Sequence, residues 1–336
     1  YFDAHQGKLE KQVNHLLKSK GLPKVEVPDE PFPSNWREFS INKPQLEFFN
    51  GLGGFKEGGR EYQIFLDEKK VTPAPWINVI SNSKGFGFLV SESGSCHTWS
   101  QNSRENRITP WSNDSILDPS GEIIYLYDQD TKESWSPTPG YARDKSSYLV
   151  RHGQGYSIFE HNSFEIAQKL SMYVSLDKEV KFVRLKLKNL SNVKRRISAY
   201  YYLEWVLGYH RTQTAHHIIT KQGGGKNIFY AQNRIQHDFG NNITFACSSK
   251  EVTSFTCHRA SFVGRHGDFD KPVALNQKGL DKKIGAGLDP CLAMKIDLEL
   301  NPQEEDEIIF LLGQTSDDSQ IQQLVEKFLK PKMADH

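Results

Sequence analysis

The stretch EVKFVRLKLKN (residues 179–189) decides the fold class of this chain. Leu185 and Leu187 alternate with basic side chains, and a period of two residues is typical of a β-strand with one buried and one hydrated face. Residues 197–208 (ISAYYYLEWVLG) predict a second long strand, which is rich in aromatic side chains. Both segments therefore indicate antiparallel sheets.

Shorter strand-like runs recur on both sides of this stretch, at the spacing that is typical of an all-β sandwich or barrel. Clusters of glycine and other turn-forming residues separate them. The glycine-rich segment 51–59 does not connect a strand to a helix, so it predicts a hairpin turn rather than a phosphate-binding loop. Further strands are expected within 61–66, 75–81, 86–91, 122–128, 148–152, 155–161, 242–247, 291–301 and 307–313.

Helices are expected at both ends of the chain. Apolar residues at helical spacing predict a helix over 3–20, and a proline-rich linker follows at 28–36. A second amphipathic helix is predicted near the other end, with Ser316 or Asp317 as its N-cap. The expected regions are an N-terminal helix and linker at 1–40, a β-domain at 41–315, and the beginning of a helical segment at 316–336.

The composition excludes several classes of protein. The chain has 42 basic and 41 acidic residues, for a formal net charge of +1, so no basic surface for nucleic acid or for a membrane is expected. No apolar run is long enough for a transmembrane helix. The four scattered cysteines predict buried thiols in a reducing compartment. No metal site is expected, because the adjacent His216 and His217 would point to opposite faces of a strand.

A polar segment, SCHTWSQNSRENRITPWSND (95–114), has the composition of a sugar-binding site. Indole faces pack on the C–H face of a sugar ring, and amide, carboxylate and guanidinium groups match its hydroxyls. The alternative is a connection between strands, with tryptophans in the core, arginines in ion pairs and asparagines in turns. The binding candidates in this segment are Trp99, Asn102, Arg104, Asn106, Arg107, Trp111, Asn113 and Asp114.

A second candidate lies in the segment RHGQGY (151–156), at the end of a predicted strand. Arg151 and His152 are binding candidates there, because ligand sites often lie at strand ends. The alternative for His152 is an imidazole that backbone hydrogen bonds hold beside a turn.

Taken in order, several stretches of the β-domain resemble the N-terminal sandwich of the inverting disaccharide phosphorylases. This is the cellobiose and chitobiose phosphorylase family, glycoside hydrolase family 94, and the resemblance is nearest to the module found in cyclic β-1,2-glucan synthases. The resemblance covers roughly residues 45–315. The matching stretches are EFFNGLGGF (47–55), GREYQI (59–64), TPAPWINVISN (72–82), FGFLVSESG (86–94), TWSQNSRENRITPWSND (98–114), YLYDQDTKESWSPTP (125–139), VRHGQGYSIFEH (150–161), YYLEWVLG (201–208) and GAGLDPCLA (285–293).

The resemblance implies a large antiparallel β-supersandwich, similar to galactose mutarotase, with flanking helices. In these enzymes a helical linker and an (α/α) barrel that carries the catalytic acid follow the sandwich. The resemblance therefore implies that no catalytic residue lies in this chain, and that the barrel of the same polypeptide is a partner. It implies a glucan site that the sandwich helps to close, in an enzyme that uses inorganic phosphate as co-substrate and no other cofactor.

The implied ligand is β-1,2-glucan or another β-glucoside, and a homodimer is compatible with the family. The parent protein would be embedded in the bacterial inner membrane, with this region on its cytoplasmic side. Two alternatives stay open. One is a stand-alone glycan-binding module. The other is a mutarotase-like aldose epimerase in which His152 pairs with Glu160 or Glu204 for acid–base chemistry.

Overall fold

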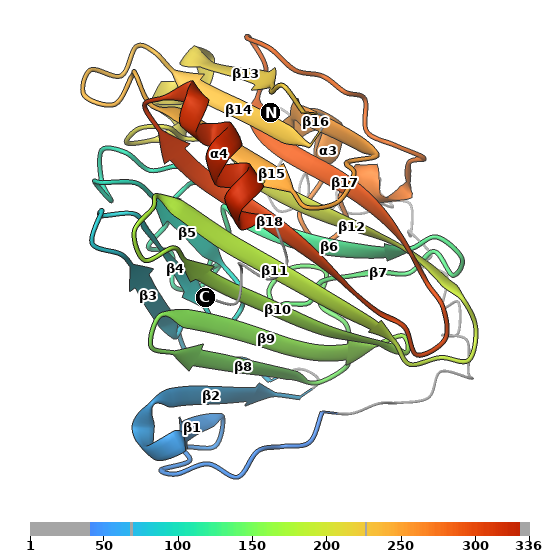
Figure 1. Ribbon diagram of the computed structural model, residues 1–336. Coiled ribbons are helices and arrows are strands. Elements are labelled where there is room, and N and C mark those ends of the chain that lie inside the picture. The colour runs from blue at the N-terminus through green and yellow to red at the C-terminus, as the bar shows by residue number, and fades with distance from the viewer. Residues whose placement is uncertain (1–40, 68–69, 226, 330–336) are drawn as a thin grey trace, which may run out of the picture. The chain divides into compact units, whose positions relative to one another are not determined.

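The computed structural model describes residues 41–67, 70–225 and 227–329 (Figure 1). The predicted helix at 3–20 and the proline-rich linker at 28–36 lie outside the described residues. Within these residues the chain is almost entirely β-structure, as predicted. None of the helices in the described ranges is long and apolar enough to cross a membrane.

The largest sheet has ten strands, and every neighbouring pair in it is antiparallel. In spatial order its strands are β1 (Gly53–Lys56), β2 (Glu61–Leu66), β8 (Tyr148–Gly153), β9 (Tyr156–Ser163), β10 (Ile166–Val174), β11 (Val180–Asn189), β18 (Glu305–Thr315), β15 (Ile243–Ser248), β14 (Ile228–Asn233) and β13 (Ile218–Gln222).

Two smaller antiparallel sheets complete the sandwich. The five-stranded sheet consists of β16 (Ser254–His258), β17 (Pro290–Leu300), β12 (Arg195–Glu204), β6 (Glu122–Asp128) and β7 (Ser134–Trp135). The three-stranded sheet consists of β3 (Ile77–Ser81), β4 (Gly87–Ser91) and β5 (Cys96–Trp99). One continuous apolar core contains buried residues of all three sheets, among them Leu185, Tyr201 and Val90. The predicted β-supersandwich is therefore confirmed.

Strand β11 has the alternation predicted from its sequence. Leu185 and Leu187 are fully buried in the core, whereas the side chains of Lys186 and Lys188 are partly exposed on the other face. At the beginning of the strand the outer face is also covered, because Phe182 packs there against a helix. The hydrated face is therefore limited to the second half of β11.

The covering helix is α4 (Asp318–Phe328), where the amphipathic pattern predicted a helix. Its N-cap is Asp317, whose carboxylate accepts a hydrogen bond from the Ser319 backbone N–H at 2.9 Å. Ile321 and Phe328 are buried against the outer face of the ten-stranded sheet, and the ring of Phe328 lies 5.1 Å from that of Phe182.

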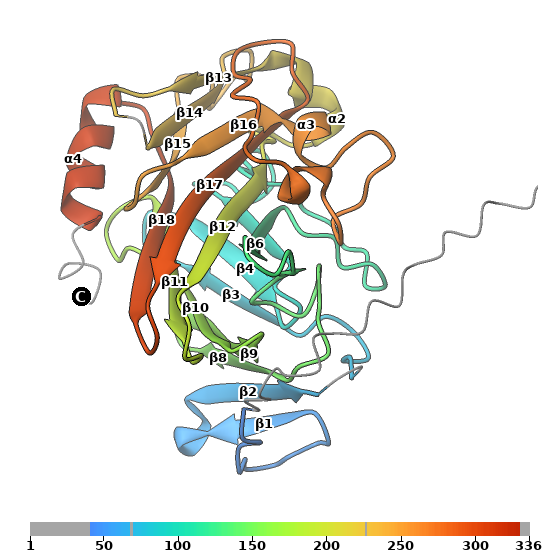
Figure 2. The ribbon, with the colours of Figure 1, turned by 90° about the vertical axis from the view of Figure 1, so that its right-hand side faces the viewer.

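The outer face of the five-stranded sheet is covered by the long connection between β16 and β17. This connection contains α3 (Arg259–Phe262) and the short 3₁₀ helix η4 (Val273–Asn276). Its Phe262 stacks on Tyr202 of β12, with ring centroids 4.8 Å apart. Figure 2 shows α4 and this connection on opposite sides of the sheets.

Three local expectations are corrected by the structure. The strand predicted over 197–208 ends at Glu204, because the chain leaves the sheet there while its apolar side chains stay buried. The hairpin turn predicted over 51–59 is confined to the 3₁₀ helix η2 (Glu57–Gly59), since β1 begins at Gly53. His216 and His217 lie in the 3₁₀ helix η3 (Ala215–His217), which follows α2 (Arg211–Thr214), and not in a strand.

Candidate functional site

Four side chains from two distant segments form an alternating row of cations and aromatic rings. The guanidinium carbon of Arg107 lies 5.5 Å from the ring centroid of Trp111 and 5.2 Å from that of Tyr209. The guanidinium carbon of Arg104 lies 5.2 Å from the ring of Tyr209. These distances are within the roughly 6 Å at which a cation is attracted by a ring face. We refer to Trp111, Arg107, Tyr209 and Arg104 as the cation–aromatic ladder.

Backbone pairing fixes the ladder in place. The Arg107 N–H donates to the Gly208 carbonyl at 3.1 Å, and the Gly208 N–H donates back to Arg107 at 3.2 Å. The side chain of Arg107 adds two bonds, since its Nε donates to the Ser103 carbonyl at 3.1 Å and its Nη1 to the Tyr209 carbonyl at 3.2 Å. The segment after β5 is therefore tied to the segment after β12.

Asn102 and Arg104 build the exposed end of this segment. The Asn102 Oδ1 accepts hydrogen bonds from the backbone N–H groups of Arg104 at 2.9 Å and Glu105 at 3.0 Å, which is an Asx turn. Arg104 pairs with Glu105 at 3.3 Å, and both side chains are exposed. An exposed pair of this kind contributes at most about 1 kcal/mol, so it leaves the guanidinium group of Arg104 available to a ligand.

Two of the predicted binding residues lie inside the molecule. Trp99 is 9% exposed and packs in the core beneath Trp111 at 6.3 Å between ring centroids. Asn106 is 1% exposed, and its amide donates to the Ser100 carbonyl at 2.9 Å and to Oε1 of Gln314 at 2.7 Å. Both residues therefore support the segment from below.

Asn113 and Asp114 shape the exposed part of the same segment. The indole N–H of Trp111 donates to Asn113 Oδ1 at 2.8 Å, which fixes the orientation of the ring. The Asp114 carboxylate accepts from the backbone N–H groups of Leu117 at 3.0 Å and Ile116 at 2.9 Å, and these bonds lower its pKa. The exposed asparagine and carboxylate thus lie next to the half-buried indole, at the Trp111 end of the ladder.

Arg151 and His152 are placed elsewhere, on β8 of the ten-stranded sheet. Arg151 forms ion pairs with Glu61 at 2.9 Å and Glu160 at 3.1 Å on the outer face. The ring nitrogens of His152 lie 2.9 Å from Ser157 Oγ and 3.2 Å from the Trp76 carbonyl oxygen. Burial lowers the pKa of His152 to about 4.

The register of β8 and β9 determines whether His152 could form an acid–base pair with Glu160. Arg151 and Glu160 bond on one face of the sheet, and His152 and Ser157, which are register partners, bond on the other. His152 and Glu160 therefore face opposite sides. Glu204 belongs to a different sheet and pairs with Arg211 and Arg259 at 2.9 and 2.6 Å. The alternative in which His152 works with either carboxylate is therefore not favoured by this geometry.

Tyr209 is a ladder residue that the sequence analysis did not single out. It follows the end of β12, in a segment without a periodic apolar pattern, so the sequence does not predict whether its side chain is buried or exposed. Its contact with Arg107 forms only in the folded chain. Its one signal is that it is a large aromatic residue in a polar segment next to His210.

The ladder can bind but has no evident acid or base for catalysis. Its guanidinium groups are donors for hydroxyl or phosphate oxygens, and its rings offer flat apolar faces. Across the parts of the chain that the structure describes, no group of three or more His, Cys, Asp or Glu could hold a metal ion. The four cysteines are buried as predicted, and each is a free thiol.

Comparison with known proteins identifies the domain. A sequence profile described as "Glycosyl hydrolase 94, supersandwich domain" matches residues 60–331. Cyclic beta-(1,2)-glucan synthase NdvB of Rhizobium meliloti (strain 1021) is 34% identical over 284 residues, which are 84% of this chain and 10% of that protein. N,N'-diacetylchitobiose phosphorylase of Vibrio proteolyticus is 24% identical over 271 residues, which are 78% of this chain and 33% of that enzyme.

Among solved structures, the chain is similar to a GalM/aldose epimerase homologue from C. elegans, with a TM-score of 0.45 and 8% identity over 72% of this chain and 99% of that chain. The chain spans about a tenth of the synthase and a third of the phosphorylase that it matches. The family profile covers most of the described β-structure, including both segments of the ladder. The chain therefore belongs to glycosyl hydrolase family 94, of which it carries the supersandwich domain.

Proposed function

We propose that this domain is a non-catalytic part of a glucan-processing phosphorylase module, in which it helps to form the glucan site. The cation–aromatic ladder carries the proposal. Arg107 is held between the rings of Trp111 and Tyr209, and the hydrogen bonds from its guanidinium group to two backbone carbonyls fix it before a ligand arrives. Preformed donors beside flat rings suit a sugar with vicinal hydroxyl groups.

The relatives point to the substrate class. The names of the two similar proteins specify a cyclic β-1,2-glucan synthase and a disaccharide phosphorylase, so β-1,2-glucan or a related β-glucoside is the ligand proposed for this chain. In this proposal phosphate attacks the glycosidic bond, and a single carboxylic acid on an (α/α) barrel of the same polypeptide protonates the leaving oxygen. The supersandwich then contributes contacts with the glucan and with the barrel.

Location and assembly follow from the same proposal. The parent polypeptide would be anchored in the bacterial inner membrane, and this domain would lie on the cytoplasmic side, where buried free thiols persist. The proposal also includes a homodimer, in which the ladder of one copy would lie next to the active site of the other.

The test is a phosphorolysis assay with this chain, β-1,2-glucan and inorganic phosphate. No glucose 1-phosphate is expected, and robust release by this chain alone would contradict a non-catalytic role. The complete reading frame tests the rest of the proposal, because it should encode an (α/α) barrel downstream. A frame without any such barrel favours the second candidate, a stand-alone glycan-binding module, which the partly exposed ladder also suits.

A further inference from the structure

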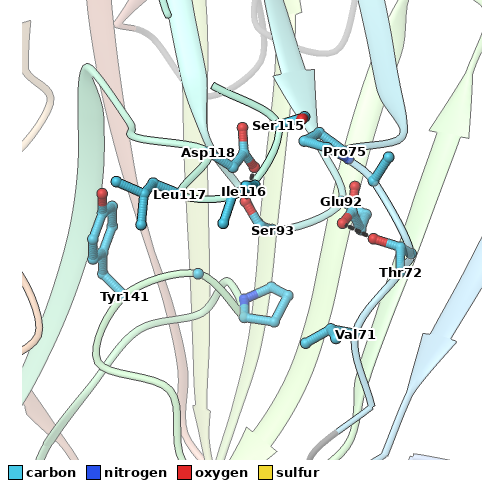
Figure 3. Close-up of a pocket in the computed structure, with 13 residues that line it drawn as sticks. Val71, Thr72, Pro75, Glu92, Ser93, Ser115, Ile116, Leu117, Asp118 and Tyr141 are labelled. Carbon is cyan, nitrogen blue, oxygen red and sulfur yellow. Dashed lines mark hydrogen bonds between the residues drawn. The ribbon is translucent and has the colours of Figure 1, made fainter. Parts of the chain in front are cut away.

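The segment that carries Trp111 continues into a second feature, a cavity of about 280 Å³. Four separate parts of the chain line it: residues 71–75, 92–93, 115–118 and 139–141 (Figure 3). Its volume lies near the lower end of the roughly 300–1,000 Å³ that small-molecule sites occupy. The cavity is therefore suited to a short ligand rather than to a peptide or a helix.

Two carboxylates in the cavity are fixed by the protein. Glu92 Oε2 accepts from the backbone N–H of Trp76 at 2.6 Å, and its Oε1 accepts from the hydroxyl of Thr72. Asp118 Oδ2 accepts from the hydroxyls of Ser91 at 2.7 Å and of Ser93. Figure 3 shows Asp118 and Glu92 flanking Ser93 in this view. Both groups are thus preorganised acceptors with lone pairs left for a ligand.

Apolar side chains form the rest of the wall. Ile116 is 90% exposed and Leu117 is 73% exposed, although both are large aliphatic residues at the rim of a hollow. Tyr141 stands beside Leu117 in Figure 3 and adds a ring to the same side. Exposed aliphatic residues gathered at a hollow are typical of a binding site.

The lining also excludes several classes of ligand. It contains no Lys, Arg or His, so a phosphate or a carboxylate would meet Glu92 and Asp118 without a counter-charge. A wholly apolar ligand would cover these carboxylates without giving them hydrogen bonds, which is unfavourable. A small cation would satisfy the carboxylates but make no use of the aliphatic rim. A sugar ring satisfies both, with hydroxyl donors at its edge and C–H groups on its face.

We propose that this cavity is a saccharide subsite that holds one end of a neutral glucan chain. Glu92 and Asp118 accept hydrogen bonds from ring hydroxyls, and Leu117 packs on the C–H face. The subsite adds detail to the proposed function. It rests on that function for one point, which is that the bound sugar is glucose. Residues 111–118 run from Trp111 to the cavity wall, so in this proposal one loop carries both a ladder residue and part of the subsite.

The test is calorimetric titration of this chain with β-1,2-linked glucose oligosaccharides. Leu117→Ser removes an exposed side chain that the fold does not need, and Asp118→Asn removes one charge at nearly constant shape. Each is expected to weaken binding by about tenfold or more, which corresponds to roughly 1.4 kcal/mol. Leu176→Ser is the matched control, because Leu176 is an exposed leucine outside both the cavity and the ladder, and the affinity of this variant should equal that of the wild type.

A Tyr209→Ala variant separates this inference from the proposed function. Loss of affinity in Tyr209→Ala alone would overturn the subsite and leave the ladder proposal intact. Loss in Leu117→Ser alone would support the subsite and contradict the role of the ladder. The absence of any sugar binding by the wild-type chain would overturn the subsite. Binding of spermidine or Ca²⁺ that Asp118→Asn abolishes, without sugar binding, would show a cation site instead.

Discussion

Lys181 Nζ lies 2.8 Å from Glu122 Oε2, and both side chains are buried between the three sheets. The same carboxylate accepts a hydrogen bond from the hydroxyl of Tyr201 at 2.6 Å, and the ammonium group contacts Cys96 Sγ at 2.8 Å. Burial by itself would raise the pKa of Glu122, but Lys181 and the hydrogen bonds outweigh this, and the pKa is lowered. The pair therefore joins β11, β6, β12 and β5 as a charged unit.

Removal of one partner of this pair should be costly. Lys181→Met leaves Glu122 buried without its counter-charge, and we expect the free energy of unfolding to fall by about 3–5 kcal/mol. The double variant Lys181→Met with Glu122→Gln should lose less than the sum of the two single variants, because no isolated charge remains buried. Urea unfolding of all four proteins measures this coupling, and additive losses would contradict it.

The ladder should require arginine and not merely a positive charge. Arg107→Lys keeps the charge but loses the planar group that stacks on Trp111 and Tyr209 and donates to two carbonyls. We expect the affinity for β-1,2-linked oligosaccharides to fall by about tenfold, or roughly 1.4 kcal/mol. Arg265→Lys is the matched control, because Arg265 is an exposed arginine in the connection between β16 and β17, outside the ladder. Equal affinities of the two variants would refute a specific role for Arg107.

Acidification should destabilise the domain through His152. Its pKa is lowered by burial from 6.5 to about 4, so between these two pH values the unfolded chain binds a proton that the folded chain does not. The free energy of unfolding therefore falls as the pH falls through this window, by up to about 3 kcal/mol. His152→Gln should flatten this part of the stability curve, measured by urea unfolding between pH 7 and pH 4. An unchanged slope in the variant would disprove the assignment.

The cap of α4 gives a smaller and separate effect. Asp317→Ala removes the acceptor for the Ser319 backbone N–H and should lower the free energy of unfolding by about 1 kcal/mol. Asp317→Asn retains an acceptor at the same place and should cost much less. Thermal unfolding of the three proteins measures the difference. If the alanine variant were as stable as the wild type, the cap would contribute nothing.

Much of the β-domain could be predicted, because period-two alternation marks strands that have one buried face. Strand β11 shows why, since Leu185 and Leu187 are buried as expected. Strand β10 was missed, because its core-facing side includes the polar Gln168, which interrupts the apolar alternation. Strand β5 was missed because its buried Thr98 and His97 look polar in sequence. In the folded chain the Thr98 hydroxyl donates to Glu122, and His97 Nε2 lies 3.1 Å from Ser95 Oγ, so both polar side chains have partners inside the molecule.

The candidate site was predictable in part. Arg107 and Trp111 stood out because flat cationic and aromatic groups are concentrated between 95 and 114. The same composition pointed equally to Asn106, whose burial depends on Gln314, a partner 208 residues away. Tyr209 joins the ladder through a pairing of two loops that no local pattern encodes. Long-range contacts of this kind decide which polar residues face solvent.

The distribution of the four thiols makes the unfolding of each sheet separately observable. Cys247 lies in the ten-stranded sheet, Cys257 and Cys291 in the five-stranded sheet, and Cys96 in the three-stranded sheet. All are buried, and burial raises the pKa of Cys96 and of Cys257 to about 12, so none reacts readily with an alkylating reagent in the folded state. Mass-resolved alkylation at increasing urea concentrations would reveal the order in which the three sheets separate, without any introduced label.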